Sequence, residues 1–596
     1  MSTFTSRMLR AAGLTGLVAA LLTPLSANAE QSEADTPCGT GGLFTASPPS
    51  CTYATPGTDT FTVPAGVSAV SVDLNGAEGG SAAGFVTPNP PNTGASGGLG
   101  GRTRATLPVT VGHDLQITVG AAGIPGSSLR GEYARPGGLG HGAGGGGAHG
   151  GGGSGGGASD LRTGAFGKDD RLLVAGGGGG AGNGGSLLRG GNGGGLVAEA
   201  GGQGGGPEGS GVGGGGASQT AHGTGSPNSA AGGPGIAGSD TDPNTGLANA
   251  GSGGPGGNGA RGGNGGGGGG GGYFGGGGGS GGGNPGNFYG AGGGGGSSYA
   301  AHSLRDAVLD AGVNRGNGKA VVSFRYDTTL ALATDTATPL FGHDVTVTAT
   351  VSSAARTPSA PSGTVNFFEG QVALGAAPLI DGRASLTTAG LRPGANALTA
   401  TYSGDGNFTA SESNGPAELT VGFSQPCITG ARTGALTVAA GQSLCLAAGA
   451  VQTGPVTVEL GGALALAGAE INGRLSADRA RALRLCGSRL AGAVTAEGTS
   501  GHVLVGSATP AMVCAGNTVV GPLTLAENTG GLEVGANTLT GQVRINGNSG
   551  SGLPPAQAAP SFSHNRLTGP LRCEGNAPEL RQEANEVQGP RSGQCR

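Results

Sequence analysis

The sequence predicts an all-β, multidomain protein in which a glycine-rich β-sandwich is followed by a second β-sandwich and a parallel β-helix. Three observations predict it. Short runs of alternating apolar and polar residues recur along much of the chain and are typical of half-buried strands. The glycine content is unusually high, at 141 of 596 residues. The last part of the chain repeats with a period of about 20 residues.

The first thirty residues have the pattern of an export signal. Arg7 and Arg10 precede the apolar stretch Ala11–Leu22, which is too short to span a bilayer, and small residues at Ala27 and Ala29 predict cleavage after Ala29. An uncleaved N-terminal anchor is the alternative. We expect a signal peptide over residues 1–29, an arm over 30–57, and a mature chain without a membrane span. That chain would be secreted and extracellular, or held at the cell surface.

The cysteines agree with an oxidising compartment. Their number is even, none forms a C-x-x-C metal pattern, and the middle of the chain has none. We expect structural disulfides, with pairing between sequence neighbours as the preferred connectivity and other connectivities left open. The candidates are Cys38, Cys51, Cys427, Cys445, Cys486, Cys514, Cys573 and Cys595. The net charge of −5 gives no reason to expect nucleic-acid or anionic-membrane binding.

The first domain, residues 58–326, has strand patterns on both sides of its glycine. Residues 59–75 predict a hairpin-like pair of strands, residues 101–120 predict two more, and residues 170–177 predict a short one. A final strand over 316–326 offers Val321 and Phe324 as core. Between Gly131 and Ala300, 80 of 170 residues are glycine. Because a few isolated strands are only marginally stable, the glycine is expected to be an insertion within one domain rather than a linker.

The strand segments carry a family resemblance. The segments "TFTVPAGVSAVSVDLNGAEGG" (60–80), "GGGASDLRTG" (155–164), "RLLVAGGGGGAG" (171–182) and "GGGGGSSYA" (292–300) resemble the bacterial secreted glycine-rich domain. That family is similar to the glycine-rich region of the anaplastic lymphoma kinase receptor ectodomain. The resemblance implies a tumour-necrosis-factor-like sandwich with polyglycine II helices inserted between strands. It also implies binding of a protein ligand, without naming a contact residue.

Polyglycine II helices have a physical basis that is independent of the resemblance. A polyproline-II-type helix has three residues per turn and no internal hydrogen bonds, so glycine helices can approach until their backbones bond to one another. Glycine loses the most entropy on ordering, so such an array needs anchoring strands. A disordered tract is the alternative. Four aromatic residues amid the glycine are candidate anchors, or else an exposed sticky patch: Tyr273, Phe274, Phe288 and Tyr289.

Residues 327–422 form the next unit, with six alternating segments separated by turn residues. This spacing is typical of an all-β sandwich. The motifs "GTVNFFEG" (363–370) and "YSGDGNF" (402–408) make the unit resemble a bacterial immunoglobulin-like domain. It has no cysteine, so its core is not pinned by a cystine. The "SGDGN" segment is expected to be a turn; a calcium loop would need the longer spacing and a closing Glu.

Residues 427–596 carry a repeat of about 20 residues in which glycine precedes a short strand. A second strand in several coils predicts two strands per coil, as in a parallel β-helix; a meandering antiparallel sheet is the alternative. The glycines are Gly434, Gly454, Gly473, Gly492, Gly521, Gly541, Gly569 and Gly589, and two intervals carry insertions. Asparagines head several coils and are expected to lie at turns and to bond along the stack: Asn517, Asn537, Asn565 and Asn585.

Nothing in the repeat predicts a reaction. Its carboxylates do not recur at one coil position, and His502 and His564 are isolated. We expect no catalytic residue, no cofactor and no metal. The favoured function is a secreted, non-enzymatic structural or adhesive protein of the extracellular space or cell envelope, with a polysaccharide or protein surface as partner. The alternatives are a polysaccharide-binding or polysaccharide-degrading β-helix protein and a receptor-like binder of a protein ligand.

Overall fold

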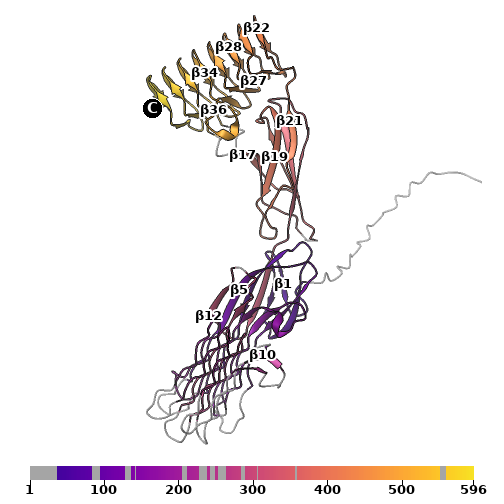
Figure 1. The fold of residues 1–596 in the computed structure, drawn as a ribbon, viewed down its shortest axis with the longest axis vertical. Helices are drawn as coiled ribbons and strands as arrows, with labels where there is room; N and C mark the ends of the chain where they lie inside the picture. The colour runs from indigo at the N-terminus through magenta and orange to yellow at the C-terminus, as the bar shows by residue number, and fades with distance from the viewer. Residues whose placement is uncertain are drawn as a thin grey trace, which may run out of the picture. The chain divides into compact units, whose positions relative to one another are not determined.

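The protein is nearly all β, as expected (Figure 1). The computed structural model describes residues 37–83, 94–127, 136–140, 143–148, 150–203, 211–226, 238–241, 248–252, 264–282, 289–304, 306–355, 359–550 and 559–596. These residues form eight sheets and no α-helix. Two short 3₁₀ turns interrupt them, η1 (Lys168–Asp170) and η2 (Pro510–Met512).

The glycine-rich part contains two antiparallel sheets. In hydrogen-bonded order the first is β1 (Leu43–Ala46), β2 (Pro49–Tyr53), β13 (Lys319–Phe324), β4 (Ala69–Asn75), β5 (Gly100–Pro108) and β12 (Val308–Asn314). The second is β11 (Tyr299–Ala300), β8 (Arg171–Ala175), β7 (Ser159–Arg162), β6 (Asp114–Val119) and β3 (Gly57–Thr62). A separate pair consists of β9 (Ser239–Thr241) and β10 (Ala248–Ser252).

The hairpin expected over residues 59–75 is wrong, whereas the two strands expected over 101–120 are present as β5 and β6. β3 and β4 lie in different sheets, where β3 pairs with β6 and β4 pairs with β13 and β5. The alternating pattern only requires that both strands bury one face, and both do so in a shared core that includes Phe61 and Leu74. On β13 the buried residues are Ala320, Val322 and Phe324, while Val321 is half-buried, because side chains two apart share a strand face.

The glycine segments continue the strands of the sandwich and hydrogen-bond to one another. Residues 176–183 follow β8 directly, and their N–H groups donate in three sets, each to one neighbouring segment. Gly177, Gly180 and Asn183 donate to 265–271; Gly178 and Ala181 to 77–80; Gly179 and Gly182 to 188–191. Their carbonyls accept from three further segments, around 290–296, 153–156 and 98. Because every third residue returns to the same neighbour, the backbone has the period of a polyglycine II helix.

At its inner glycine positions this packing leaves no room for a side chain. A Cβ built on Gly180 would lie 2.1 Å from the carbonyl oxygen of Gly153, and one on Gly178 would lie 1.9 Å from that of Gly98. Real Cβ atoms do not come this close to backbone oxygens. The glycine is therefore a packing requirement of the array. The array is continuous with β4, β6 and β8 at their C-terminal ends, which supplies the anchoring that its entropy demands.

The second sandwich has a three-stranded and a five-stranded sheet, both antiparallel. The first is β14 (Thr329–Thr334), β15 (Val345–Ser352) and β18 (Arg383–Thr388). The second is β17 (Val372–Pro378), β16 (Thr364–Glu369), β19 (Gly394–Tyr402) and β20 (Ser411–Glu412), with β21 (Ala417–Val421) also on β19. The core includes Val347, Phe367 and Tyr402. Tyr402 Oη donates a 2.5 Å hydrogen bond to Ser362 O.

The C-terminal part is a parallel solenoid with three faces, whose stacked turns are seen in Figure 1. Face 1 is β22 (Ala431–Thr433), β25 (Val451–Thr453), β28 (Glu470–Asn472), β31 (Arg489–Leu490), β34 (Thr518–Val519), β37 (Thr538–Leu539), β40 (Arg566–Leu567) and β43 (Glu586–Val587). Face 2 is β23 (Leu436–Val438), β26 (Val456–Val458), β29 (Leu475–Asp478), β32 (Val494–Glu497), β35 (Leu523–Ala526), β38 (Val543–Asn546), β41 (Leu571–Glu574) and β44 (Arg591–Gly593). Face 3 is β24 (Ser443–Leu446), β27 (Ala463–Ala467), β30 (Ala482–Cys486), β33 (Val503–Val505), β36 (Leu532–Gly535), β39 (Ser561–Ser563) and β42 (Arg581–Glu583).

The turns therefore have three strands, not the two expected from the sequence, except the last, whose described residues form strands on faces 1 and 2 only. Face 1 strands have only two or three residues. Their sequences, such as Asn-Thr-Leu-Thr before Gly541, resemble a loop rather than a strand, so the sequence did not predict them. The recurring glycine lies at the corner between faces 1 and 2. A Cβ on Gly541 would lie 2.2 Å from Gly521 O, and one on Gly473 would lie 2.2 Å from Gly454 O. The glycine repeat marks this column of close backbone contacts.

Candidate functional site

Of the described aromatic residues of the glycine tract, Tyr273 packs on sandwich strands, whereas Phe274 and Tyr289 pack on other segments of the tract. The Tyr273 ring stacks on Tyr299 of β11, with centroids 4.0 Å apart and planes at 8°. Arg171 of β8 lies over the same ring, its Cζ 4.3 Å from the centroid. The Phe274 ring meets His222 edge-on at 4.9 Å, and its N–H donates to Ser297 Oγ at 3.1 Å.

Tyr289 and Phe288 complete this set of predicted residues. Tyr289 packs against a small cluster inside the array that includes Ala181 and Leu188. Phe288 lies outside the described residues. Both faces of the Tyr273 ring are occupied by protein groups, so this ring forms contacts within the domain and offers no platform to a ligand.

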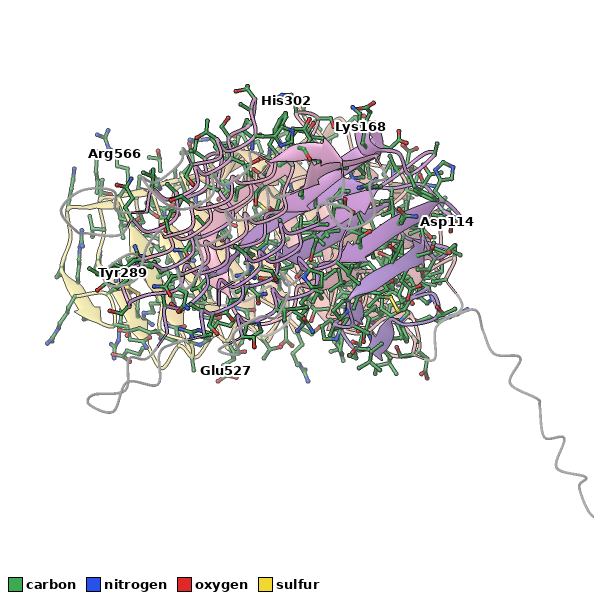
Figure 2. The ribbon with its side chains drawn as sticks, turned by 90° about the horizontal axis from the view of Figure 1, so that it is seen from below. Asp114, Lys168, Tyr289, His302, Glu527 and Arg566 are labelled. Atoms are coloured by element: carbon green, nitrogen blue, oxygen red, sulfur yellow. A yellow bond between two sulfur atoms is a disulfide. The ribbon has the colours of Figure 1, made fainter. Side chains whose placement is uncertain are left out.

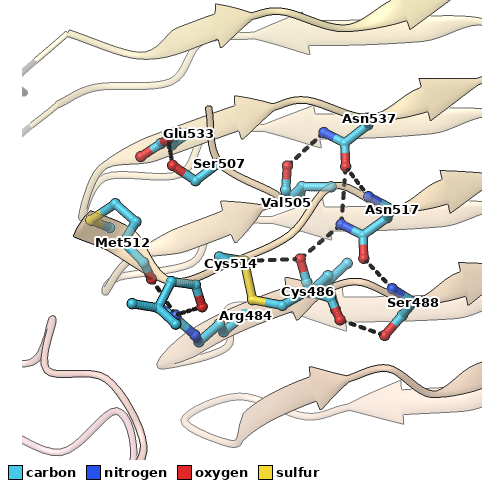
Figure 3. Close-up of a disulfide and its surroundings, with 12 residues drawn as sticks. Arg484, Cys486, Ser488, Val505, Ser507, Met512, Cys514, Asn517, Glu533 and Asn537 are labelled. Carbon is cyan, nitrogen blue, oxygen red and sulfur yellow. Dashed lines mark hydrogen bonds between the residues drawn. A yellow bond between two sulfur atoms is a disulfide. The ribbon is translucent and has the colours of Figure 1, made fainter. Parts of the chain in front are cut away.

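The cysteines form four disulfides between sequence neighbours: Cys38–Cys51, Cys427–Cys445, Cys486–Cys514 and Cys573–Cys595. The Cys486–Cys514 bond holds an insertion between β33 and β34 against β30 (Figure 3). Arg484 Nη2 supports the same insertion, because it donates to Met512 O at 2.6 Å and to Val513 O at 3.1 Å. Four disulfides fit an extracellular protein. Within the described ranges, no helix is long and apolar enough to cross a membrane.

The four asparagines singled out in the sequence form a ladder between faces 3 and 1, of which Figure 3 shows Asn517 and Asn537. Asn517 shows the pattern: its N–H and Nδ2 both donate to Asn537 Oδ1, at 2.8 and 3.0 Å, and Nδ2 also donates to Leu485 O at 2.8 Å. Each side chain thus satisfies backbone groups of two turns. The ladder continues through Asn565 to Asn585 and begins at Ser488, whose N–H donates to Asn517 Oδ1 at 2.9 Å.

A second ladder was not anticipated. Asn528 Nδ2 donates to Asn548 Oδ1 at 2.8 Å, Asn548 Nδ2 to Asn576 Oδ1 at 3.0 Å, and Asn576 Nδ2 to Gln594 Oε1 at 2.8 Å. It runs between faces 2 and 3, and Thr499 begins it. A signal for it was present in the sequence, because Asn528, Asn548 and Asn576 are separated by the same 20 and 28 residues that separate Asn517, Asn537 and Asn565.

The outer surface of face 2 is a regular array of hydroxyl and guanidinium side chains. One outward residue of each strand lies in register with the next, in the order Thr437, Thr457, Ser476, Thr495, Thr524, Arg544, Arg572 and Ser592. Eight parallel strands extend this row over about 34 Å. On face 1, Arg566 lies on the outside of the solenoid and pairs with the exposed Glu586 at 2.9 Å (Figure 2).

Carboxylates do recur at one position, which corrects the sequence-based expectation. Asp478 of β29 pairs in register with Glu497 of β32, and Glu459 directly follows β26 at the equivalent place. Their sequence spacing of 19 residues was visible but was obscured by the Asp for Glu exchange. Asp478 pairs with Arg479 on the surface at 3.3 Å. Within the described residues, no group of three or more His, Cys, Asp or Glu could hold a metal ion.

The C-terminal end of face 3 contains a polar cavity of about 160 Å³. Two in-register columns of outward residues line it. Glu533, Ser561 and Arg581 form one column, while Ser563 and Glu583 form the other. Val534 and Phe562, between the columns, point inward and are buried. Thr509 of the disulfide-held insertion contributes to the wall.

Glu533 is the electrostatically perturbed member of this cavity. Burial raises the pKa of its carboxyl above the usual value; the hydrogen bond from Ser507 Oγ and the nearby Arg484 act in the opposite direction but do not cancel it. The Ser507 hydroxyl donates to Glu533 Oε1 and also accepts the Thr509 N–H at 3.0 Å. The insertion therefore fixes the position of this carboxylate, which retains capacity for further hydrogen bonds. Sequence reasoning did not single out Glu533, Arg581 or Glu583.

The middle sandwich can be compared with known proteins. Its two antiparallel sheets share one core, and its Asp405 turn follows β19. Residues 332–422 match the family model of the bacterial Ig-like domain (group 3). The expected bacterial Ig-like domain is thereby confirmed over residues 332–422. No curated protein matches the chain. The Ig-like domain and the β-solenoid together suggest an extracellular adhesive or binding protein.

Proposed function

We propose that this chain is a secreted, non-enzymatic structural or adhesive protein that acts in the extracellular space or at the cell envelope. The observation that carries the proposal is the solenoid surface. Face 2 displays an in-register row of hydroxyl and guanidinium groups over about 34 Å, which is a large, regular surface for a repetitive partner.

The supporting features agree in kind. Residues 332–422 match a bacterial Ig-like domain family, and the four disulfides fit an oxidising compartment. Export would be driven by the expected signal peptide at 1–29, which lies outside the described residues. The partner in this proposal is an extracellular polysaccharide or a protein surface.

The test uses the purified full-length mature chain. It is mixed with insoluble envelope polysaccharide prepared from bacterial cells, and the bound fraction is measured after sedimentation. Reducing ends are measured in the same samples. We expect retention on the particles without release of reducing ends. Absence of retention on polysaccharide and on protein-coated particles would refute adhesion, and steady release of reducing ends would refute the non-enzymatic role.

Two other functions remain proposals. A polysaccharide-binding or polysaccharide-degrading role is favoured by the polar cavity around Glu533, which offers several hydrogen-bonding groups in one concave place. A receptor-like role, in which residues 58–326 bind a protein ligand, rests on the resemblance of that segment to the receptor glycine-rich region. Capture of one defined protein by the full chain, lost when 58–326 is removed, would support the receptor-like role.

A further inference from the structure

We propose that the polar cavity at the C-terminal end of face 3 binds one sugar ring of a neutral polysaccharide. The inference deepens the adhesive function proposed above and rests on it for the identity of the surroundings, which are extracellular. The site itself is argued from its size, its spacing, its charges and its rigidity.

The size and spacing fit a sugar ring. A cavity of about 160 Å³ is roughly tenfold larger than the about 10–15 Å³ that a single water molecule needs. Its charged groups lie at three corners of a small rectangle of strand positions, and Gly535 lies at the fourth. Glu533 and Arg581 are two strands apart, or about 9.6 Å, and the second column with Ser563 and Glu583 is two residues along, or about 6.6 Å. A hexose presents hydroxyl groups around a ring of this extent, so groups on opposite sides of the cavity can each reach one.

The charges select a neutral ligand. Arg581 lies in the same column as Glu533 and two residues before Glu583 on β42, so the wall has one cationic and two acidic groups. An anion would meet two carboxylates, and a cation would meet the guanidinium. Neutral hydroxyls avoid both conflicts, because a hydroxyl donates to a carboxylate and accepts from a guanidinium. Apolar ligands are disfavoured, since they would desolvate these groups without replacing their hydrogen bonds.

The site is held rigidly before any ligand arrives. Ser507 fixes Glu533, and the Cys486–Cys514 disulfide fixes the insertion that carries Ser507 and Thr509. The three strands beneath the cavity belong to the solenoid core through Val534 and Phe562. A preformed arrangement reduces the entropy lost on binding, which is the main obstacle for a small polar ligand.

The test is isothermal titration calorimetry on the full-length mature chain with five probes. Three are neutral tetrasaccharides, of glucose, mannose and galactose; one is tetragalacturonate and one is the glucosamine tetramer. We expect at least one neutral tetrasaccharide to bind and both charged probes to bind at least about tenfold more weakly. Glu583→Gln and Glu533→Gln should each weaken the neutral ligand by about tenfold, the loss of one charge-assisted hydrogen bond.

The matched control is Glu586→Gln. Glu586 lies three residues from Glu583 in the same turn but on face 1, where it pairs with the exposed Arg566, so the variant should bind within twofold of the wild type. If a thermal melt shows that Glu533→Gln is unstable, the variants Glu583→Gln and Arg581→Ala are used for the test instead, because Glu583 is exposed. Absence of binding by all neutral probes, stronger binding of a charged probe, or equal binding by Glu583→Gln and Glu586→Gln would each overturn the inference.

Failure of this site and failure of the proposed function are distinguishable. If the chain sediments with envelope material but binds no neutral tetrasaccharide, the cavity assignment is wrong and adhesion stands. If the tetrasaccharide binds and depends on Glu583 while the chain does not sediment, the cavity assignment stands and adhesion is wrong. Release of reducing ends from the bound tetrasaccharide would replace binding with catalysis at this cavity and so overturn the inference as stated.

Discussion

At many positions of this protein the residue type follows from the backbone around it. Some side chains bond to backbone groups that need a partner, and some positions admit only glycine because the backbone leaves no more space. Asp405 in the "SGDGN" turn is the clearest case of the first kind. Its Oδ1 accepts the N–H groups of Asn407 and Phe408, both at 2.8 Å, and its Oδ2 accepts the N–H and Oγ of Ser362 at 2.9 and 2.7 Å. The carboxylate thus closes the turn after β19 onto the segment before β16.

This arrangement predicts a pH-dependent contribution to stability. Burial would raise the pKa of Asp405, but the hydrogen bonds from Ser362, Asn407 and Phe408 outweigh it, so the pKa lies below its usual value. For a carboxyl with a lowered pKa, the stabilisation is present above the unfolded-state pKa of about 3.9 and is lost as the pH falls through the folded-state pKa.

We expect Asp405→Ala to lower the free energy of unfolding of the Ig-like domain by about 2 kcal/mol at pH 7. The difference from the wild type should shrink below about pH 4. Denaturant unfolding of the full chain at pH 7, 4 and 2.5 measures it. Glu412→Ala, an exposed carboxylate on β20, is the control and should change stability by less than about 0.5 kcal/mol. A difference that stays constant with pH would contradict the role of the ionised carboxylate.

At the scale of elements, the solenoid is held by its corners as much as by its apolar interior. The glycine column between faces 1 and 2 lets successive backbones approach. At the other two corners, some backbone N–H and C=O groups lack partners in neighbouring strands, and the asparagine side chains of the two ladders bond to them. Buried asparagine is unfavourable unless every polar atom is bonded. Each interior rung meets this condition, because one rung's Nδ2 donates both to the next rung and to a backbone oxygen.

Removal of one rung should therefore be strongly destabilising. Asn537→Ala leaves the Asn517 N–H, the Asn517 Nδ2 and Val505 O without their partner, and we expect a loss of about 3 kcal/mol or more in the free energy of unfolding. Thr538→Ala is the neighbouring control, since Thr538 is exposed on face 1. Thermal and denaturant unfolding measure both. Equal stability of the two variants would show that the ladder contributes nothing.

At the scale of the whole molecule, the disulfides mark places where the chain would otherwise open. Cys427–Cys445 lies at the first turn of the solenoid and Cys573–Cys595 at its last. The terminal turns of a solenoid have a neighbour on one side only, so they are the least stable. Cys573–Cys595 and Gln594 together hold the last turn, since Gln594 also ends the second ladder.

We expect the paired change Cys573→Ser and Cys595→Ser to fray this end. Closing a loop of this length stabilises by about 3 kcal/mol, so amide exchange over residues 581–596 should rise by roughly a hundredfold while the central turns keep their protection. Hydrogen–deuterium exchange with mass spectrometry measures it. The change Cys38→Ser and Cys51→Ser is the control and should leave residues 581–596 unaffected. Unchanged exchange at this end in the first variant would contradict the assignment.

The sequence predicted the parts of this fold that depend on local backbone rules. The glycine and asparagine columns of the solenoid were visible because one residue type recurs at one corner. The prediction of a hairpin from β3 and β4 was wrong, because alternation shows that each strand buries one face but does not show to which sheet each strand belongs. The third solenoid strand failed because a two-residue strand such as β37 has no pattern of its own.

The cavity could not be predicted from the sequence for a similar reason, because its lining residues come together only through strand pairing. Glu533 and Arg581 lie 48 residues apart in the sequence, and an insertion interrupts the repeat between them. Only the register of β36, β39 and β42 brings them to one wall. Conversely, the row of Glu459, Asp478 and Glu497 keeps a uniform spacing. A search that grouped Asp with Glu at each coil position would have found it.

The three-residue return of hydrogen bonds in segment 176–183 has a genetic consequence. Loss or gain of one residue would turn every later N–H by one third of a turn, from its own acceptor toward the space of a different neighbour. Ala181 and Asn183 would then point their side chains where only glycine fits. Inside the array, length can change only in whole turns of three residues, or nine bases of coding sequence. We therefore expect insertions and deletions in this domain only in steps of three residues, or beyond the ends of its helices.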